Sequence, residues 1–453
     1  MTASRSLSPS RRTVLQAGGL AGAALLTGTA SAAARSVLSG TGAPGSGVPA
    51  DAPRTGFEQR SGASWTTHAE ELDFLAAVAA RSSRVTLTVL GQSLEGRPLH
   101  LVRLSLPGRR DARPTALVLG SQHGNEPAGR ETALAWLRDL ALTTDPLLVR
   151  QLEEQDLLFV PSANPDGRAR NSRGNAAGVD LNRDHLTLTQ PESRMVGEVI
   201  RDLAPALALD LHEYGPTVPV LYDDDVLYLW PRNLNVDASV RDLSRTLCEE
   251  YIAKGARASG FTADEYGLYK LGPQEVTQTA GDENEQICRN AVGLRHVLGV
   301  LVESAVTQSP VRPGEVLSTA QNQSRRVASQ RQVLADTLRF LREQGETAHF
   351  VSSTAPARKA REGAERSAPV YFGGADNQPP TAAQVLFPPP SGYALPGAPS
   401  KDLQELFVRH GITTRVDAAG RTVVPMGQAA EPVVPLLLDG RAPRPVLAAE
   451  PLD

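Results

Sequence analysis

Several residue types are scarce in this sequence, and each shortage excludes a kind of site or partner. Cysteine occurs only twice, at Cys248 and Cys288, with no CxxC pair or Cys/His cluster, which excludes a cysteine-based zinc site. Aromatic residues make up 4% of the chain, too few for a protein that works mainly by base stacking. Neither sign of charge dominates, with 46 basic and 50 acidic residues, so we expect no nucleic-acid partner. Beyond the amino-terminal segment there is no apolar run long enough to span a membrane, so we expect a soluble protein.

The amino-terminal segment, residues 1–34, is typical of an export signal. Arg11 and Arg12 stand directly before a mild apolar run rich in Gly and Ala, and small residues at 30–32 form a cleavage site. The arginine pair predicts a twin-arginine-type signal, hence the twin-arginine export machinery as partner and an extracellular or cell-envelope location. An ordinary secretory signal would lead out of the cytoplasm as well. Export leaves two states open for Cys248 and Cys288, one disulfide or two buried thiols.

Strand-like and helix-like segments alternate through the middle of the chain. This alternation predicts an α/β fold with a mixed central sheet and helices on both faces. The expected strands are residues 84–90, 98–104, 115–120, 157–161, 207–211 and 298–303. The expected helices are residues 67–80, with Thr67 as cap and Glu70 three residues on, and residues 128–142, 192–203, 236–258 and 327–344.

Composition divides the rest of the chain. Residues 35–62 are rich in Gly, Ser, Ala and Pro and predict a flexible linker, and residues 63–345 form the main domain. Residues 346–400 predict a connecting segment, charged and flexible at first and then rich in Pro and Gly. Residues 401–453 predict a small C-terminal α/β accessory unit, with a helix at 403–411 and strands at 422–426 and 433–438.

Three side chains near the ends of expected strands have the types and spacing of a catalytic zinc site. Such a site takes three protein ligands and leaves a position for water. His123 and Glu126, three residues apart across a strand end and a turn, can face one point, and His212 ends another strand. The pair His212-Glu213 does not begin an HExxH helix, because Pro216 stands where the second histidine would be, so Glu213 is not assigned as a base.

Four segments together resemble the zinc carboxypeptidase family, the carboxypeptidase A-like enzymes. They are HGNE at 123–126, NPDG at 164–167, GVDLNR at 178–183 and the distal His212, and SLEGRP at 93–98 resembles the family's early hairpin. The resemblance covers residues 65 to 305 and implies a bacterial exported member whose catalytic domain is residues 63–345.

The resemblance implies a role for each matching residue. One zinc ion would be bound by His123, Glu126 and His212. Asn182 and Arg183 would hold the substrate's terminal carboxylate, a role that suits a planar guanidinium. Asp180 would orient the first zinc histidine through its other ring nitrogen. Arg173, nine residues before Asn182, would stabilise the oxyanion, with Arg168 and Arg170 as competitors for that role.

The expected catalytic base is Glu303. It follows the apolar run Val300-Leu301-Val302, and burial at the end of such a strand would raise the pKa of a carboxyl group toward a useful range. The family likewise keeps its catalytic glutamate on a strand.

The chain departs from the family pattern at several places. Asp184-His185 follows Arg183 where Asn-aromatic is common, and the negative charge of Asp184 is expected to alter the carboxylate site. The substrate-capping tyrosine has no certain counterpart, although Tyr266 and Tyr269 lie in the right region.

The expected function is therefore zinc-dependent removal of C-terminal residues from peptides with a free C-terminal carboxylate. Three alternatives remain open at this point: a deacylase of acyl-amino acids, a cell-wall peptide amidase, and a non-catalytic binder of peptide C-termini.

Overall fold

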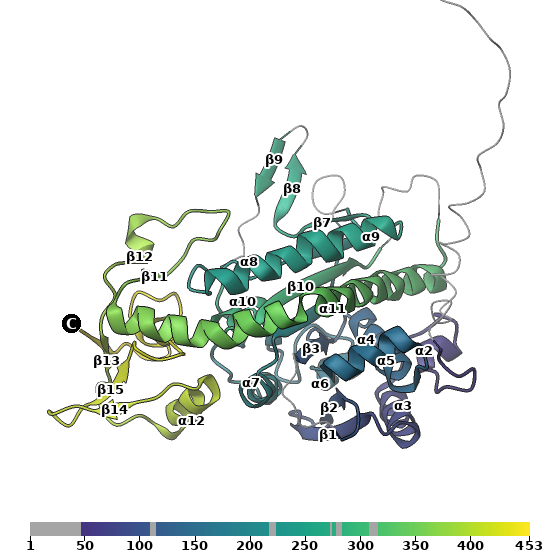
Figure 1. Ribbon diagram of the computed structural model, residues 1–453, viewed down its shortest axis with the longest axis horizontal. Coiled ribbons are helices and arrows are strands. Elements are labelled where there is room, and N and C mark those ends of the chain that lie inside the picture. Colours follow the sequence, from purple (N-terminus) through teal and green to yellow (C-terminus); the bar gives the residue numbers. More distant parts are fainter. Residues whose placement is uncertain (1–46, 109–114, 217–222, 272–273, 278–282, 308–315) are drawn as a thin grey trace, which may run out of the picture.

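A computed structural model describes residues 47–108, 115–216, 223–271, 274–277, 283–307 and 316–453 (Figure 1). The signal expected at residues 1–34 lies outside these ranges. The described residues contain an eight-stranded sheet in the order β1-β2-β4-β3-β5-β10-β6-β7. Its strands are β1 (Val85–Gln92), β2 (Pro98–Leu104), β3 (Thr115–Gly120), β4 (Asp156–Val160), β5 (Leu207–Tyr214), β6 (Val226–Leu229), β7 (Ala263–Glu265) and β10 (Leu298–Ala305).

Helices cover both faces of this sheet, as the alternation in the sequence predicted. Along β3, Ala116 and Val118 pack in one core, while Leu117 and Leu119 pack in another. The first core includes side chains of α3 (His68–Arg81), α4 (Ala128–Leu142), α8 (Ala238–Thr246) and α11 (Thr319–Glu365). The second includes side chains of α7 (Pro191–Leu203) and α10 (Cys288–Leu294). The predicted α/β class with a mixed sheet is confirmed.

Most predicted elements form within two residues of the expected bounds. Thr67 and Glu70 make the expected capping box at the start of α3. The helix expected at 236–258 is continuous but changes type, from α8 through a π-helical turn (η2, Leu247–Ala253) to α9 (Lys254–Ala258). A short hairpin, β8 (Leu268–Leu271) and β9 (Gln274–Thr277), extends away from the sheet at the top of Figure 1.

The pairing of β5 with β10 determines which side chains meet at the edge of the sheet. These strands are parallel neighbours, and Glu303 is in register with His212. Because side chains alternate along a strand, His212 and Asp210 share the face of Ala208, which packs in the same core as α10. Polar residues gather at the carboxyl ends of these strands, where open α/β sheets bind ligands.

The carboxyl-terminal part of the expected linker is packed against the main domain, contrary to the sequence-based prediction. Thr55 and Glu58 form a capping box on α2 (Gly56–Gln59), and the Phe57 ring stacks on Trp65 at 5.0 Å. Arg138 of α4 pairs with Glu58 at 2.5 Å. The composition of residues 35–62 concealed these few anchoring side chains.

The beginning of the expected connecting segment is also helical. Helix α11 runs from Thr319 to Glu365 and passes through Pro356, so residues 346–365 are helical (Figure 1). Small residues such as Gly345, Ala348 and Ala355 form its buried stripe in this part, which gives little apolar periodicity to read from the sequence. The buried Lys359 completes the packing by pairing with Glu431 at 3.1 Å.

The C-terminal unit joins the core of the main domain. Its four-stranded sheet, in the order β14-β15-β13-β16, uses a strand from the expected connecting segment. The strands are β13 (Gly392–Ala394), β14 (Arg415–Val416), β15 (Thr422–Pro425) and β16 (Glu450–Leu452). The strand expected at 433–438 is instead a helix, α13 (Val434–Leu438), since a short apolar run fits either structure and Pro435 suits a first helical turn. Side chains of α12 (Lys401–His410) and α13 lie in one core cluster with those of β3 and β5.

Smaller elements complete the described chain. They are α5 (Pro146–Glu154), α6 (Pro165–Arg170), η1 (Leu181–Arg183), β11 (Val370–Tyr371), η3 (Ala382–Gln384) and β12 (Val385–Leu386). No helix in the described ranges has the length and apolar character needed to cross a membrane.

The shared core predicts that the two parts unfold together. Phe407 of α12 is 3% exposed, and Phe407→Ala is expected to lower the free energy of unfolding by about 3–5 kcal/mol. Val408→Ala is the matched control, because Val408 is 62% exposed, and about 0.5 kcal/mol or less is expected there. Urea unfolding followed by circular dichroism should give one transition that Phe407→Ala shifts as a whole. Two transitions, with only one moved, would show an independent C-terminal unit.

Candidate metal centre

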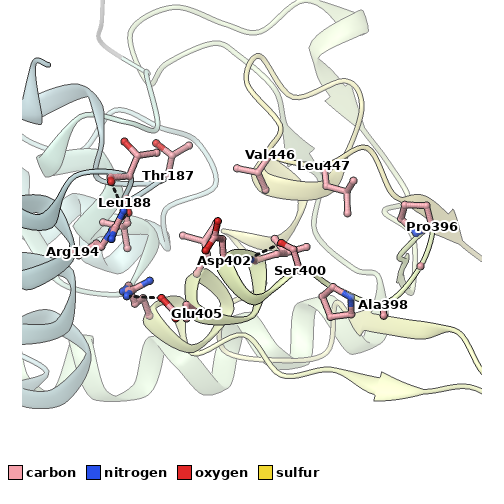
Figure 2. Close-up of a pocket in the computed structure, with 16 residues that line it drawn as sticks. Thr187, Leu188, Arg194, Pro396, Ala398, Ser400, Asp402, Glu405, Val446 and Leu447 are labelled. Atoms are coloured by element: carbon pink, nitrogen blue, oxygen red, sulfur yellow. Dashed lines mark hydrogen bonds and ion pairs between the residues drawn. The ribbon is translucent and has the colours of Figure 1, made fainter. Parts of the chain in front are cut away.

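Two cavities differ sharply in the chemistry of their walls. The larger, about 740 Å³, lies between Thr187–Arg194 and the C-terminal unit, and includes Asp402 and Glu405 of α12 (Figure 2). Its walls contain none of the residues that the sequence predicted for a site. The smaller, about 390 Å³, is lined by His123, Glu126 and Glu303, together with Arg173, Asn182 and Arg183. Chemistry rather than size identifies the smaller cavity as the candidate site.

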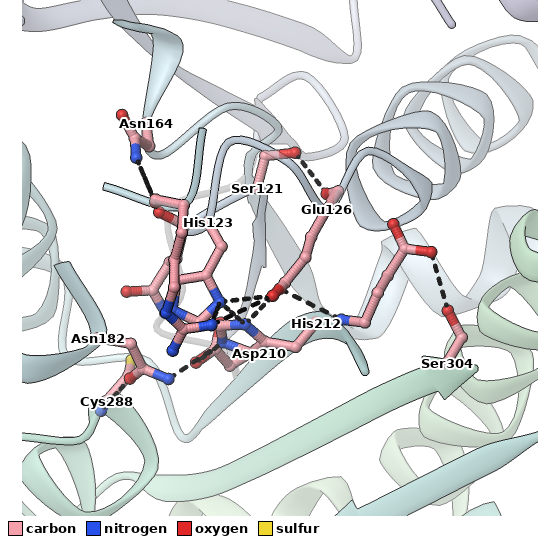
Figure 3. A network of polar contacts seen from close by, with 12 residues as sticks. Ser121, His123, Glu126, Asn164, Asn182, Asp210, His212, Cys288 and Ser304 are labelled. Atoms are coloured by element: carbon pink, nitrogen blue, oxygen red, sulfur yellow. Dashed lines mark hydrogen bonds and ion pairs between the residues drawn. The ribbon is translucent and has the colours of Figure 1, made fainter. Parts of the chain in front are cut away.

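The three predicted metal ligands converge at the edge of this cavity (Figure 3). The Nδ1 atom of His123 lies 2.7 Å from Glu126 Oε1, and Nδ1 of His212 lies 2.9 Å from Glu126 Oε2. The two Nδ1 atoms are 3.1 Å apart. All three side chains are buried, so their ligand atoms face one another rather than water.

Carboxylates on the far side fix both imidazole rings. His123 Nε2 lies 3.0 Å from Asp180 Oδ1, the contact expected for Asp180. His212 Nε2 lies 2.8 Å from Asp210 Oδ2. Such outer contacts orient a ligand nitrogen and raise its basicity. The sequence-based prediction assigned no role to Asp210. Its position two residues before His212 on one strand places both side chains on one face and could have indicated this contact.

The electrostatics of the cluster favour charged carboxylates. Burial would raise the pKa of Glu126, but His123 and His212 lower it to about 2. Burial would lower the pKa of His212, but Asp210 and Glu126 raise it well above its usual value. Burial would also raise the pKa of Asp180, whereas His123 and Arg173 lower it. The charged carboxylates of the cluster would therefore stabilise a cation placed between the ligand atoms.

The donor set fits zinc. Two imidazole nitrogens and one carboxylate are the protein ligands of many catalytic zinc sites, which keep a further position open. The ligand atoms of His123, Glu126 and His212 lie within 4.8 Å of one another. Because His123 and Glu126 line a cavity, a water or substrate atom has room beside the cluster.

Glu303 lies next to this cluster on the neighbouring strand. Its register with His212 places both side chains on the same face of the sheet. Burial raises the pKa of Glu303 to about 7. Its Oε2 atom is buried and accepts no hydrogen bond from the part of the chain that the structure describes. A carboxylate in this state is suited to exchange a proton with a group in the cavity.

The structure separates Arg173 from its two competitors. Arg173 donates to Asp180 at 2.9 Å, and its guanidinium lies 3.2 Å from His123 Nδ1. Arg168 turns away and donates to the Gly124 carbonyl at 2.6 Å. Arg170 pairs with the exposed Glu95. Of the three arginines, Arg173 is the one that lines the cavity.

Asn182 and Arg183 lie together at the cavity but in different surroundings. Asn182 is buried, with Nδ2 3.3 Å from His212 Nε2 and Oδ1 accepting from the Cys288 amide at 2.8 Å. Arg183 is exposed and donates to the Asn182 carbonyl at 2.7 Å. Both residues line the cavity.

The expected effect of Asp184 on the carboxylate clamp is not supported by its surroundings. Asp184 accepts hydrogen bonds from the amides of Thr189 and Gln190, and from the hydroxyls of Thr187, Thr189 and Ser193. Its charge therefore stabilises the turn into α7 and is absent from the cavity wall. The neighbouring His185 lies 2.5 Å from Gln122 Oε1, and burial lowers its pKa to about 4.

Helix α11 holds the strand ends that carry the site. Gln330 donates to the His212 carbonyl at 2.7 Å and to the Ser304 hydroxyl at 2.9 Å. Arg326 pairs with Glu213 at 2.6 Å, which gives Glu213 a structural partner. These contacts are long-range in sequence, and no local pattern predicted them.

Two further expectations concern side chains near the cavity. Tyr266, one of the two capping candidates, lines the cavity, whereas the side chain of Tyr269 lies outside the described part of the structure. Cys248 and Cys288 are both buried free thiols, so the disulfide alternative is not observed.

Known proteins resemble part of this chain. A scan against protein families matches residues 71–270 to the family described as zinc carboxypeptidase. Carboxypeptidase 2 of Trichophyton tonsurans is 31% identical over 268 residues, which cover 57% of this chain and 47% of the relative. Carboxypeptidase SOL1 of Arabidopsis thaliana is 36% identical over 147 residues, which cover 29% of this chain and 30% of the relative. The chain thus spans about half the length of the fungal relative.

Solved structures also match part of the chain. A metallo-carboxypeptidase from Pseudomonas aeruginosa, in complex with (2-guanidinoethylmercapto)succinic acid, is 24% identical with a TM-score of 0.48. The match covers 61% of this chain and 69% of that chain.

The contact between Asp180 and His123 predicts an effect on metal binding. Asp180→Asn is expected to weaken zinc binding about 10- to 100-fold, because the uncharged amide orients the ring less firmly and lowers its basicity. Asp202→Asn is the matched control, since Asp202 is exposed on α7 and pairs with Arg201. Zinc affinity is measured by competition with a chromophoric chelator. Equal affinities for the two variants would contradict this role of Asp180.

Proposed function

We propose that this chain, in which residues 71–270 match the zinc carboxypeptidase family, removes residues from the carboxyl ends of peptides by zinc-dependent hydrolysis. One observation carries the proposal. A single cavity is lined by two members of the ligand cluster, His123 and Glu126, by a carboxylate, Glu303, and by an arginine, Arg183, that suits a substrate carboxylate, and His212 completes the cluster behind its wall.

His123, Glu126 and His212 would hold one zinc ion. When bound, zinc supplies a Lewis acid that lowers the pKa of a coordinated water to about 7. Asp180 and Asp210 contact the Nε2 atoms of His123 and His212, which would leave the two Nδ1 atoms to hold the metal. The buried surroundings of His123, Glu126 and His212 would strengthen the electrostatic effect of a bound ion.

Glu303 moves the proton. It takes a proton from the attacking water, whose oxygen forms a bond to the scissile carbonyl carbon. It then gives this proton to the leaving nitrogen as the C–N bond breaks. A pKa that burial raises to about 7 suits both halves of this exchange.

Arginines on two sides of the cavity orient the substrate. Arg173, beside His123, donates to the carbonyl oxygen as negative charge develops there. Arg183 and Asn182 hold the free terminal carboxylate. Because this clamp is fixed in the wall, the last peptide bond meets the ligand cluster and internal bonds do not.

The protein is expected to act outside the cytoplasm. The arginine pair Arg11-Arg12 before an apolar run supports recognition by the twin-arginine export machinery. Such export would give the enzyme access to extracellular or cell-envelope peptides.

The proposed reaction predicts a specific dependence on the substrate terminus. A peptide with a free C-terminal carboxylate should lose residues one at a time, while the same peptide with a terminal amide should be cleaved far more slowly. Glu303→Gln should lower kcat/KM by about 10²–10⁴-fold, because the amide cannot accept a proton. Glu283→Gln, outside the cavity wall, is the matched control. Mass spectrometry of timed digests measures both effects.

The same digests decide between the proposal and its alternatives. Internal cleavage would contradict the carboxypeptidase activity. Preferential hydrolysis of acyl-amino acids or of cell-wall peptides, offered in parallel, would favour the deacylase or the amidase. Tight binding of free C-termini without turnover, unchanged by Glu303→Gln, would favour a non-catalytic binder.

The export proposal has its own test. Replacing both Arg11 and Arg12 by Lys keeps the charge but removes the paired guanidinium groups, and the unprocessed chain should then remain in the cytoplasm. Immunoblots of cell fractions, with Arg5→Lys as control, measure the change. Equal export of the double variant would point to the ordinary secretory route.

A further inference from the structure

We propose that Glu213 is a positioning residue of the metal centre, because it ties together the two chain segments that carry the ligands. This inference rests on the proposed function and adds a residue to its metal centre. One segment is the end of β5, with His212, and the other is the turn of His123 and Glu126 that leads into α4. Glu126 and His212 are 86 residues apart in the sequence, so the geometry of the ligands depends on contacts between the two segments.

Glu213 and the Glu126 segment are joined by two hydrogen bonds of opposite direction. The backbone amide of Glu213 donates to Oε2 of Glu126 at 3.2 Å. In return, Oε2 of Glu213 accepts from the backbone amide of Ala128 at 3.0 Å. The Glu126 oxygen that receives the first bond also lies 2.9 Å from Nδ1 of His212. The backbone and the side chain of Glu213 therefore fix the end of β5 relative to a ligand atom.

The carboxylate of Glu213 serves as the cap of α4. This helix begins at Ala128, and the residue before it, Pro127, has no side-chain atom that could accept a hydrogen bond. The first N–H groups of a helix lack partners within the helix, and the helix dipole favours a negative charge beside them. Glu213 supplies an acceptor and a charge from a different element of the fold. The start of α4, two residues after Glu126, is thereby held by β5.

The backbones beside this bond are in close contact. A Cβ atom at Gly129 would lie 2.8 Å from Leu211 Cβ and 2.9 Å from the Leu211 carbonyl oxygen. A residue with a side chain could not approach so closely without displacing one of the two elements. The first turn of α4 therefore lies directly on β5, next to His212.

Arg326 of α11 keeps the Glu213 carboxylate in place. Its Nε and Nη2 atoms donate to Oε1 and Oε2 of Glu213, at 2.6 and 2.9 Å. The guanidinium lies over the Trp65 ring, 4.8 Å from its centre. The Glu213 side chain is 0% exposed, and a carboxylate so deeply buried is tolerated because two parallel charge-assisted bonds replace its water. These bonds also fix the direction in which the carboxylate points toward Ala128.

Asp139 offers a matched comparison that separates positioning from stabilisation. It is 2% exposed and pairs with Arg331 of the same α11 at 2.8 Å. It lies in the last turn of α4, at the end of the helix remote from Glu126. Loss of either carboxylate removes a buried ion pair to α11, but only the loss of Glu213 releases the two ligand segments from each other.

The test uses the full chain, freed of metal and titrated with zinc in competition with a chromophoric chelator. Glu213→Gln is expected to weaken zinc binding about 10- to 100-fold, the range for outer partners of metal ligands, because the amide lacks the charge that caps α4 and pairs with Arg326. Asp139→Asn should leave zinc affinity unchanged. Thermal unfolding of the metal-free proteins measures the stability that each variant has lost. The visible spectrum of the cobalt-substituted proteins, which reports ligand geometry, should change for Glu213→Gln and not for Asp139→Asn.

A milder variant decides if Glu213→Gln fails to fold. Glu213→Asp keeps the charge beside Arg326 but shortens the reach toward the Ala128 amide by one methylene group, so it too should weaken zinc binding relative to Asp139→Asn. Equal zinc affinities of the Glu213 and Asp139 variants, or an unchanged cobalt spectrum, would overturn the positioning role. Failure of both Glu213 variants to fold, with Asp139→Asn folded, would assign Glu213 to stability and overturn it as well. These results leave the proposed function intact, whereas a wild type that binds no zinc would overturn the proposed function itself.

Discussion

The parallel pairing of β5 with β10 is the constraint on which the site depends. It sets His212 beside Glu303, so that a proposed metal ligand and the proposed base project from adjacent strands on the same face. A slip of one residue would turn one of them to the opposite face, since side chains alternate along a strand. Gln330 of α11 reinforces this register, because its amide donates both to the His212 carbonyl and to the Ser304 hydroxyl.

The ionisable side chains of the site are buried, and burial alone would favour their uncharged forms. Neighbouring groups of opposite charge offset this effect for most of them. Desolvation alone would neutralise Glu126, His212 and Asp180, yet each is held in its charged form by a partner within hydrogen-bonding reach. Glu303 has no such partner among the described residues, and its pKa stays raised, to about 7. The contrast between paired and unpaired carboxylates divides the site into groups that hold charge and one, Glu303, that is suited to exchange a proton.

The sequence predicted what depends on local pattern. The mixed sheet, α4 and the capping box of α3 follow from periodicity and capping, and the spacing of His123, Glu126 and His212 was enough to propose a cluster that the fold then brings together. What it could not predict depends on contacts between distant segments. The second half of α11 is buried by small residues and a buried ion pair, and the charge of Asp184 is satisfied by hydroxyls that only the fold gathers around it. Asp210 acquires its role only because its strand places it behind His212.

Helix α11 connects the site to the C-terminal unit, so the two parts of the chain depend on each other structurally. Its first turns hold the ends of β5 and β10 through Arg326 and Gln330, and its last turns pair with the C-terminal unit through Lys359. A chain cut at residue 345, the end of the expected catalytic domain, would divide this helix. The packing of the C-terminal unit therefore contributes to the stability of the same helix that fixes the spacing between His212 and Glu303. The site is built at one edge of the sheet, but the helix that keeps its geometry is anchored in a part of the chain outside the family match.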